Sequence, residues 1–295
     1  MSNSFAATTA APPHGSAGSF DYTKDDFLLI SNLLREETGI HLQDSKSTLV
    51  YSRIAKRVRA LGLSSFGAYC EHISRDTAER QIMIEALTTN TTNFFRENHH
   101  FEYLQKELVG TLVEAARRRR PVRIWSSASS SGQEPYSIAL TILAVAPDAP
   151  KLDIRILATD VNTQMVARGA AGTYDEEEVR EIPAAQLSRY FTKSTSDSGP
   201  RYTATDEIKK LISFQQLNLF ENWPMRRRFD VIFCRNVMIY FSAETQMGLW
   251  QRLAEKLDDG GCLFIGHSER VTGACAAHLE PIGITAYRKR VGQRS

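Results

Sequence analysis

Polar residues follow four apolar stretches in the second half of the chain. Glu134 comes after "VRIWSSASSSGQ", and Asp160 ends "ILATD". Asn218 follows "ISFQQL", and the pair Arg235 and Asn236 ends "FDVIFCRN". Because the carboxyl ends of parallel strands meet at one edge of a sheet, we expect these side chains to line one site. A carboxylate such as Asp160 can accept from both hydroxyls of a ribose, and the two amides can bind an adenine or an amino-acid group.

Each of these residues also has an ordinary structural explanation. Asp160 can cap the helix that follows it, and Glu134 can complement the dipole of a first helical turn. Asn218 belongs to a residue type that is common in turns. Their occurrence at successive strand ends favours the functional interpretation.

The loop between Ser126 and Glu134 lacks the features of the common phosphate-binding turns. It holds one glycine, Gly132, whereas dinucleotide loops use several so that backbone N–H groups can approach a pyrophosphate. The chain contains no Gly-Lys pair, which a Walker loop requires. A carboxylate repels phosphate and attracts an ammonium or a sulfonium. The loop therefore favours S-adenosylmethionine (SAM), which carries an amino acid, a ribose, an adenine and a sulfonium but no phosphate, over NAD or ATP.

The composition is that of a soluble globular protein. The chain has 295 residues, 42% of them hydrophobic and 24% charged, which is enough for two modest domains. A net charge of +2 gives no reason to expect a nucleic-acid partner. The longest apolar run, residues 139–146, is too short to cross a bilayer, and the N-terminus shows no secretory signal. The four cysteines form no C-x-x-C pair, so we expect reduced thiols, no metal site and a cytoplasmic protein.

The first third of the chain carries helical signals. Residues 1–20 are rich in Ala, Ser, Pro and Gly, which predicts a disordered tail. In residues 21–90, Thr23 and Asp26 form a capping box, and apolar residues repeat at helical spacing over four segments. We therefore predict a small helical domain, followed by a linker and a connecting helix over residues 91–121.

Residues 122–291 alternate between strand and helix patterns, which implies a parallel sheet with right-handed crossovers. Strands are predicted at 122–126, 154–159, 212–216, 229–234 and 262–266, and helices at 135–146, 163–170 and 243–257. The alternation breaks between Tyr174 and Phe214, where a predicted helix, 176–190, and a polar loop indicate a small inserted β-subdomain at about 187–215. The closing segment "LEPIGITAYRKR" predicts a terminal hairpin.

Six motifs follow one another along the chain: "ALTTNTTNFFRENHHFEYL", "SSGQEPYS", "ATDVN", "LNL", "FCRNVMIYF" and "GHSE". In this order they resemble the motifs of the bacterial chemoreceptor glutamate O-methyltransferases, the CheR family, and the resemblance covers the chain from about Phe20 onward. It implies an N-terminal all-α domain joined to a Rossmann-like, class I SAM-dependent methyltransferase domain of the α/β class, with a small inserted β-subdomain. It also implies methyl transfer from SAM to glutamate carboxylates of chemoreceptors in chemotactic adaptation, with S-adenosylhomocysteine (SAH) as the second product.

The resemblance also implies a set of residues that contact the cofactor. Taken motif by motif, they are Asn90, Thr92 and Arg96 from "NTTNFFR", Glu134 from "GQEP" on the methionine amino group, Asp160 from "ATD" on the ribose, Asn218 and Leu219 from "LNL" near the adenine, and Arg235 and Asn236 from "FCRN" by the methionyl part. Family members often carry two acidic residues in the first loop, whereas this chain has Gln133 and Glu134. We therefore expect Glu134 to be the carboxylate that matters.

The reaction needs no general base, because a glutamate side chain with a reference pKa of about 4.3 is already an anion at neutral pH. The sequence agrees, since it shows no nucleophile–base motif, and we interpret His99, His100 and His267 as packing or capping residues. The rate enhancement then comes from excluding water and from aligning oxygen, methyl carbon and sulfur. Arg96 can orient a carboxylate and Tyr240 can line the acceptor pocket, so both are candidate catalytic residues.

The helical domain favours a protein acceptor. Receptor segments of the kind that the resemblance implies are long acidic helices, and the face that carries Arg53 and Arg57 is a candidate docking surface through charge steering. A solvated helix face explains these two arginines equally well. We expect a monomer that neither inserts into a membrane nor binds nucleic acid. Two alternatives remain open: a non-catalytic SAM-binding sensor or scaffold, and a carboxyl methyltransferase with another acceptor.

Overall fold

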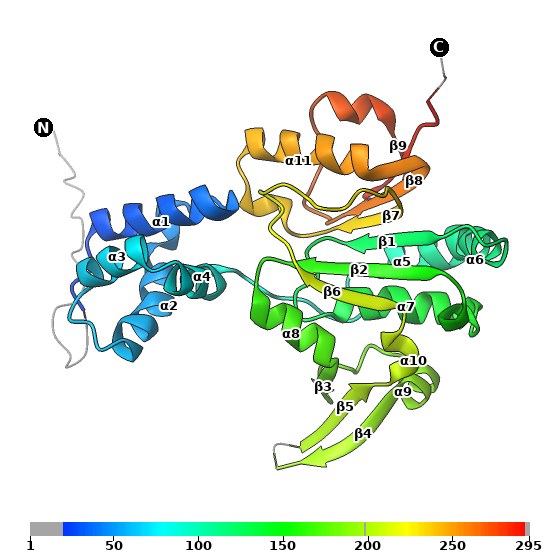
Figure 1. The fold of residues 1–295 in the computed structure, drawn as a ribbon, viewed down its shortest axis with the longest axis horizontal. Coiled ribbons are helices and arrows are strands. Elements are labelled where there is room, and N and C mark those ends of the chain that lie inside the picture. The colour runs from blue at the N-terminus through cyan, green and yellow to red at the C-terminus, as the bar shows by residue number, and fades with distance from the viewer. Residues whose placement is uncertain (1–19, 198, 293–295) are drawn as a thin grey trace, which may run out of the picture.

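The computed structural model describes residues 20–197 and 199–292. Figure 1 shows a group of helices on one side, an α/β body beside it, and a small sheet that projects from the body. The tail predicted for residues 1–20 lies outside the described residues except for Phe20, whose ring packs against Phe66.

Four helices build the N-terminal part, as predicted: α1 (Lys24–Thr38), α2 (Ser47–Ala60), α3 (Phe66–Arg75) and α4 (Thr77–Leu87). Thr23 and Asp26 form the predicted capping box at the start of α1. The apolar stripes of the four helices bury a core of their own, which includes Phe27, Ile54 and Tyr69. A short 3₁₀ turn, η1 (Asp44–Lys46), leads into α2.

An irregular segment connects this helical part to the α/β body. Residues 88–98, here called the strap, contain no regular secondary structure. They lead into α5 (His99–Tyr103), a π-helical turn η2 (Leu104–Leu108) and α6 (Val109–Arg117). Phe94 fixes the strap to the small sheet that projects from the body, because its buried ring meets the rings of Tyr174 and Phe191 edge-on.

Seven strands form the main sheet, in the order β6-β2-β1-β7-β8-β10-β9. The parallel strands are β6 (Ile212–Gln216), β2 (Ile154–Asp160), β1 (Val122–Ser126), β7 (Phe229–Cys234) and β8 (Leu257–Ile265). The predicted terminal hairpin adds β9 (Leu279–Gly283) and β10 (Ala286–Lys289) in antiparallel pairing. Because β1 lies between β2 and β7, the strand order reverses there, and such a switch point is where open α/β sheets bind ligands.

Helices cover both faces of the main sheet (Figure 1). They are α7 (Gln133–Val145), α8 (Thr163–Ala171) and, on the opposite face, α11 (Ala243–Lys256). Successive strand residues alternate between two cores: Ile124 belongs to the core that contains α7 residues, and Trp125 to the core that contains α11 residues. Within the described part of the chain, no helix is both long and apolar enough to pass through a bilayer.

The inserted subdomain is a three-stranded antiparallel sheet in the order β3-β5-β4. Its strands are β3 (Thr173–Asp175), β4 (Phe191–Ser196) and β5 (Gly199–Ala204). It therefore starts earlier than the predicted range, about 187–215, because β3 belongs to it. It also ends earlier, because β6 pairs with β2 in the main sheet. A short helix, α10 (Asp206–Lys209), leads back to β6.

The prediction of a helix at 176–190 is wrong for the first half of that range. Only α9 (Ala184–Tyr190) is helical, and turns precede it. Pro183 explains the break, because proline has no N–H to donate and disfavours a helical conformation in the residue before it.

Candidate active site

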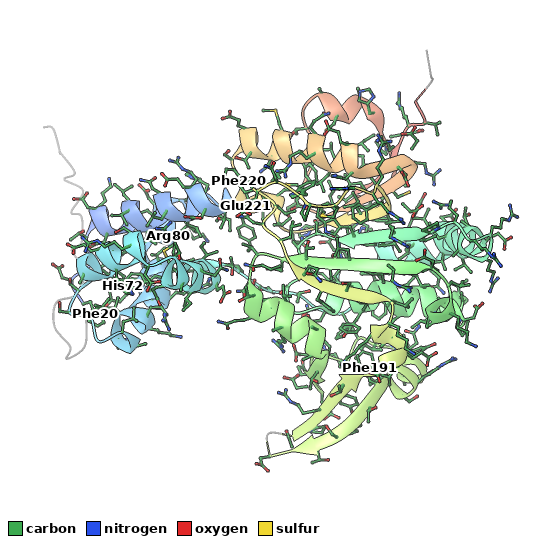
Figure 2. All side chains as sticks on the ribbon, viewed as in Figure 1. Phe20, His72, Arg80, Phe191, Phe220 and Glu221 are labelled. Atoms are coloured by element: carbon green, nitrogen blue, oxygen red, sulfur yellow. The ribbon has the colours of Figure 1, made fainter. Side chains whose placement is uncertain are left out.

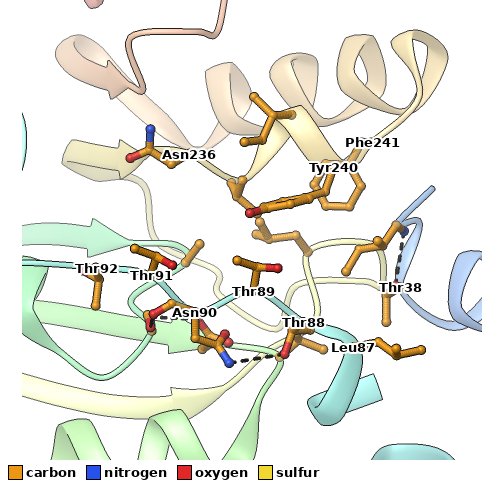
Figure 3. Close-up of a pocket in the computed structure, with 18 of the residues that line it drawn as sticks. Thr38, Leu87, Thr88, Thr89, Asn90, Thr91, Thr92, Asn236, Tyr240 and Phe241 are labelled. Carbon is orange, nitrogen blue, oxygen red and sulfur yellow. Dashed lines mark hydrogen bonds between the residues drawn. The ribbon is translucent and has the colours of Figure 1, made fainter. Parts of the chain in front are cut away.

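A cavity of about 540 Å³ opens between the helical part and the carboxyl ends of the central strands. Figure 3 shows Thr88 to Thr92 of the strap on one side of it, with Asn236, Tyr240 and Phe241 opposite. This volume is typical of small-molecule sites. Every residue predicted to contact the cofactor lines the cavity, and so does Tyr240: Asn90, Thr92, Arg96, Glu134, Asp160, Asn218, Leu219, Arg235 and Asn236.

Glu134 lies buried in the first turn of α7. Its Oε1 accepts a hydrogen bond from the Ser126 hydroxyl at 2.7 Å, and its Oε2 accepts one from Arg235 at 3.0 Å. Burial raises the pKa of Glu134, and the positive charge of Arg235 opposes that shift. A carboxylate that merely complements a helix dipole can remain exposed, so this burial favours a binding role over the ordinary explanation.

Arg235 joins the end of β7 to the strap. Its side chain is 2% exposed, and it donates both to Glu134 and to the backbone carbonyl of Arg96. A second carboxylate, Glu97, lies 3.5 Å from its Nη2. Its terminal nitrogens are therefore bound within the protein, and Arg235 positions both Glu134, which lines the cavity, and Glu97, which does not.

Glu97 does not line the cavity, but it holds two residues that do, Arg235 and Asn236, and the sequence reasoning missed it. Its Oε1 accepts from Asn236 Nδ2 at 3.1 Å and lies 3.1 Å from His267 Nδ1. Burial alone would raise the pKa of Glu97, but Arg235, Asn236 and His267 together lower it to about 2. The only signal in the sequence was an acidic residue directly after Arg96 in the motif that precedes the α/β half.

The histidines take two different roles. His100 is buried and packs as predicted, with its Nε2 2.9 Å from Thr285 Oγ1 and its ring beside Phe264. His267, in contrast, is exposed and contacts Glu97. Glu97, His99 and His100 bring possible ligand atoms within 4.8 Å of one another. The guanidinium of Arg235 beside Glu97 opposes a cation there, since like charges repel, and burial together with Arg235 lowers the pKa of His100 to about 3.

Asp160 ends β2 and is held by backbone N–H groups. Its Oδ2 accepts from Ser130 N at 2.8 Å, and its Oδ1 accepts from Asn162 N at 3.0 Å. The cap of α8 is Asn162, whose side chain accepts from the N–H groups of the first helical turn, so the capping explanation of Asp160 does not hold. Burial raises the pKa of Asp160, and the N–H donors oppose the shift. Each carboxylate oxygen keeps a further lone pair with which a diol could be bound.

The strap is fastened to the loop that follows β1. The Ser130 hydroxyl donates to the carbonyl of Asn90 at 2.9 Å, and the Asn90 amide reaches the Thr88 hydroxyl at 3.4 Å (Figure 3). Arg96 is half-buried and donates from Nη1 to the carbonyl of Thr91 at 2.9 Å. Because that bond uses one of five guanidinium donors, Arg96 keeps donors with which to bind a carboxylate.

Asn218 combines the two explanations given for it. It lines the cavity, and its Oδ1 accepts from Phe220 N at 3.0 Å, as in a turn. Its amide also donates to the carbonyl of Glu37 at 2.6 Å and to Glu221 at 3.1 Å. Phe220 and Glu221 lie at the junction between the helices and the α/β body (Figure 2). Asn218 therefore ties the two parts together, and its contact with an adenine stays a prediction.

The two arginines predicted to form a docking face are engaged within the helical part. Arg53 lines the cavity, and its Nη1 donates to three carbonyls at the end of α4, the closest at 2.9 Å. Arg57 makes two bonds to Glu79, at 2.9 and 2.7 Å, and Glu79 is 4% exposed. Both arginines therefore meet structural needs, because the last carbonyls of α4 and the buried Glu79 need donors, and their role in receptor docking stays a prediction. Lys56 is an exposed cation on the same helix.

Comparison with known proteins places the chain in a family. Residues 90–287 match the family model described as "CheR methyltransferase, SAM binding domain", and residues 25–88 match "CheR methyltransferase, all-alpha domain". A "Probable chemotaxis protein methyltransferase" of Rhizobium etli is 46% identical over 87% of this chain and 96% of its own length. "Chemotaxis protein methyltransferase 2" of Pseudomonas aeruginosa is 40% identical over 95% of this chain and 98% of its own length.

A more distant similarity is found to a solved structure. The glycopeptide N-methyltransferase MtfA complexed with SAM has a TM-score of 0.30 and 14% identity, and the match covers 53% of each chain. The assignment therefore depends on the two family models and on the sequence relatives. Together they span the helical part, the cavity and the sheet, and on that evidence the chain belongs to the CheR methyltransferase family.

Proposed function

We propose that this SAM-dependent methyltransferase transfers a methyl group to glutamate side-chain carboxylates of bacterial chemoreceptors, which yields SAH and glutamate methyl esters. One observation carries the proposal: a single cavity joins the buried carboxylates Glu134 and Asp160 to Arg96 of the strap. Relatives named chemotaxis protein methyltransferases, which align over most of the chain, support the chemoreceptor as acceptor.

The cavity fits SAM by the chemistry of its polar groups. Two buried carboxylates, Glu134 and Asp160, suit an ammonium group and the hydroxyls of a ribose. The loop between β1 and α7 offers serines and one glycine rather than a phosphate cradle. SAM supplies a methyl group on a positively charged sulfur. We assign the remaining cofactor contacts as follows: Asn218 and Leu219 near the adenine, Arg235 and Asn236 by the methionyl part, and Asn90, Thr92 and Arg96 from the strap side of the cavity.

The chain contributes orientation and exclusion of water. Arg96 orients a carboxylate, of the cofactor or of the acceptor, with the donors that its bond to Thr91 leaves available. Tyr240, on the opposite wall, lines the space for the acceptor. The strap and the 3₁₀ turn η4 (Met238–Tyr240) enclose the cavity from two sides. The incoming carboxylate is already ionised at neutral pH, so no side chain has to remove a proton.

Residues 21–90 act in this proposal as the domain that presents the receptor, residues 91–121 as the linker and connecting helix, and residues 122–291 as the methyltransferase domain. Separate buried cores in the helical part and in the sheet support the division. We further propose that the protein works as a monomer in the cytoplasm. The four free, buried cysteines fit a reducing compartment.

The test is methyl transfer from labelled SAM to receptor-bearing membranes of the same cell, read out as alkali-labile methanol, which reports carboxyl methyl esters. We expect counts with the wild type and none with Glu134→Ala or Asp160→Ala. Tight SAH binding without counts would contradict the chemoreceptor acceptor and would point to another acceptor or to a non-catalytic sensor. Thermal stabilisation by SAH but not by NAD checks the cofactor independently.

A further inference from the structure

One buried carboxylate joins the loop after β7 to the loop after β8. Glu269, the last residue of "GHSE", is 5% exposed. Its Oε1 accepts from the backbone N–H groups of Val237 at 2.9 Å and Met238 at 2.8 Å. Its Oε2 accepts from Asn236 N at 3.1 Å and Gly266 N at 2.6 Å. Four N–H groups, one of them at the start of the 3₁₀ turn that begins at Met238, are thus satisfied by one side chain.

The backbone at this place needs such a fastening. Asn236 has a φ of 57°, a left-handed conformation that is uncommon for non-glycine residues, although asparagine adopts it more readily than most. Gly266 allows the close approach of the two loops. A Cβ at that position would lie 2.7 Å from the backbone nitrogen of Asn236 and 2.5 Å from its Nδ2. The "GHSE" motif therefore combines the space that the loop after β7 requires with the acceptor that holds it.

The fastened loop forms one wall of the cavity. Asn236, Val237, Ile239 and Tyr240 line it, whereas Glu269 is not among the lining residues. The side chain of Asn236 continues the connection to Glu97 on the strap, at 3.1 Å. Any displacement of the four N–H groups would therefore move the wall that carries Tyr240.

We propose that Glu269 is a positioning residue for methyl transfer, which sets the wall from Asn236 to Tyr240 and contacts neither substrate. The proposal rests on the proposed function for the identity of the acceptor only. Among the described residues, neither Glu134 nor Asp160 hydrogen-bonds to Glu269. Because Asn236 is itself a proposed cofactor contact, loss of Glu269 should weaken SAH binding moderately and reduce turnover much further.

Two variants act on the wall by different routes. In Glu269→Gln, the carboxamide oxygen can accept from one pair of N–H groups, while its NH₂ group faces the other pair of donors. In Gly266→Ala, the carboxylate is kept, but the added methyl group crowds Asn236 and would lie 2.9 Å from Glu269 Oε2. The matched control is Asp230→Asn at the start of β7. Asp230 is also a poorly exposed carboxylate, and it accepts from Arg123 N at 2.8 Å at the opposite end of the strand from the cavity.

Three measurements test the proposal: kcat with receptor membranes, the Kd of SAH by calorimetry, and hydrogen exchange of the amides of residues 236–238. For both wall variants we expect kcat to fall about 30-fold or more, because small misplacements at a reacting centre are costly, while the Kd of SAH rises by less than about tenfold, because Glu134 and Asp160 keep their contacts. Exchange at residues 236–238 should accelerate in both, and Asp230→Asn should change none of the three. An unchanged kcat, a parallel loss of SAH binding, or unchanged exchange in Glu269→Gln would overturn the proposal. If the wild type transfers no methyl groups to receptors, the proposed function fails, and hydrogen exchange still tests the fastening.

Discussion

Arg235 and Glu134 form a buried ion pair, with 3.0 Å between Nη1 and Oε2, where the end of β7 meets the first turn of α7. Burying two charges is favourable only when further hydrogen bonds satisfy both partners. Ser126 provides one for the carboxylate, and the carbonyl of Arg96 provides one for the guanidinium. The pair therefore fixes the strap, α7 and the central strand relative to one another before any ligand binds.

This arrangement predicts that Glu134→Gln weakens SAH binding. The substitution keeps the shape of the side chain but removes the charge that faces both Arg235 and the proposed ammonium group. Hydrogen bonds to charged groups contribute about 1.5–3 kcal/mol, so we expect the Kd of SAH to rise about 10- to 100-fold by calorimetry. The control is Glu114→Gln, an exposed carboxylate paired with Arg118 on α6, which should leave Kd unchanged. Equal affinity of Glu134→Gln and wild type would remove Glu134 from the amino-group site.

The low pKa of Glu97 predicts that the folded protein loses stability in acid. Its pKa in the folded protein, about 2, lies below its ordinary value of 4.5. A depressed carboxylate pKa stabilises the folded state above the ordinary value, and that contribution is lost as the pH falls from about 4.5 to about 2. Solvent screening limits the effect to about 1–2 kcal/mol. Urea unfolding over this pH range should therefore show a weaker pH dependence for Glu97→Gln than for the wild type. The exposed neighbour Glu102→Gln should behave as wild type, and an identical slope for Glu97→Gln would contradict the depressed pKa.

The position of Tyr240 predicts that its substitution lowers turnover without weakening cofactor binding. If its hydroxyl contacts the acceptor carboxylate, Tyr240→Phe should lower kcat about tenfold or more with receptor membranes, since one hydrogen bond to a charged group is lost. The Kd of SAH should stay the same. Tyr103→Phe is a suitable control, because its hydroxyl accepts from Arg288 at 3.2 Å at the protein surface. Full turnover by Tyr240→Phe would show that the hydroxyl takes no part.

The positions of site residues could be predicted best where a single polar side chain stands at the end of a strand. Asp160 and Arg235 directly follow buried runs of alternating or continuous apolar residues, so their place at one edge of the sheet followed from the parallel topology. Glu97 could not be placed in this way, because the strap has no periodicity from which a direction can be predicted. Its role depends on the positions of Arg235 and of Asn236, which lies 139 residues further along the chain.

The hydrogen-bond partners of side chains within the helical domain could not be predicted from the sequence either. The spacing of Arg53 and Arg57 predicts one helix face, and the structure places them on that helix. Which acceptors they meet depends on how α4 packs against α2, and amphipathic spacing does not encode that contact. The inserted sheet shows the same limit, because short strands such as β3 (Thr173–Asp175) carry too few residues for a reliable alternation.

The contacts of Arg57 predict that its substitution lowers the free energy of unfolding. Arg57→Ala would leave Glu79 buried without its ionic partner, although Tyr69 still donates to it at 3.1 Å. Breaking a buried pair by removing one partner costs about 3–5 kcal/mol, and because Arg57 itself is partly exposed we expect the lower part of that range. Denaturant unfolding measures the change, and Lys56→Ala on the same helix should leave stability unchanged. A lower affinity for receptor with unchanged stability would restore the docking interpretation of Arg57.

Gly132 predicts that the single glycine of the loop between β1 and α7 is indispensable. It has a φ of 99°, and a Cβ there would lie 2.8 Å from the Tyr174 hydroxyl and 2.9 Å from the Cα of Gly169. Gly132→Ala therefore meets both backbone strain and a steric clash, and we expect the free energy of unfolding to fall by about 2–3 kcal/mol in denaturant titrations. Because Glu134 lies two residues further on, SAH binding should weaken as well. Gly110→Ala is the matched control: Gly110 lies exposed in α6 with open space at its Cβ position, so alanine there should stabilise the protein by about 0.5–1 kcal/mol. If Gly132→Ala lowered the free energy of unfolding no more than Gly110→Ala does, close packing against Tyr174 and Gly169 would not be what holds Glu134 in place.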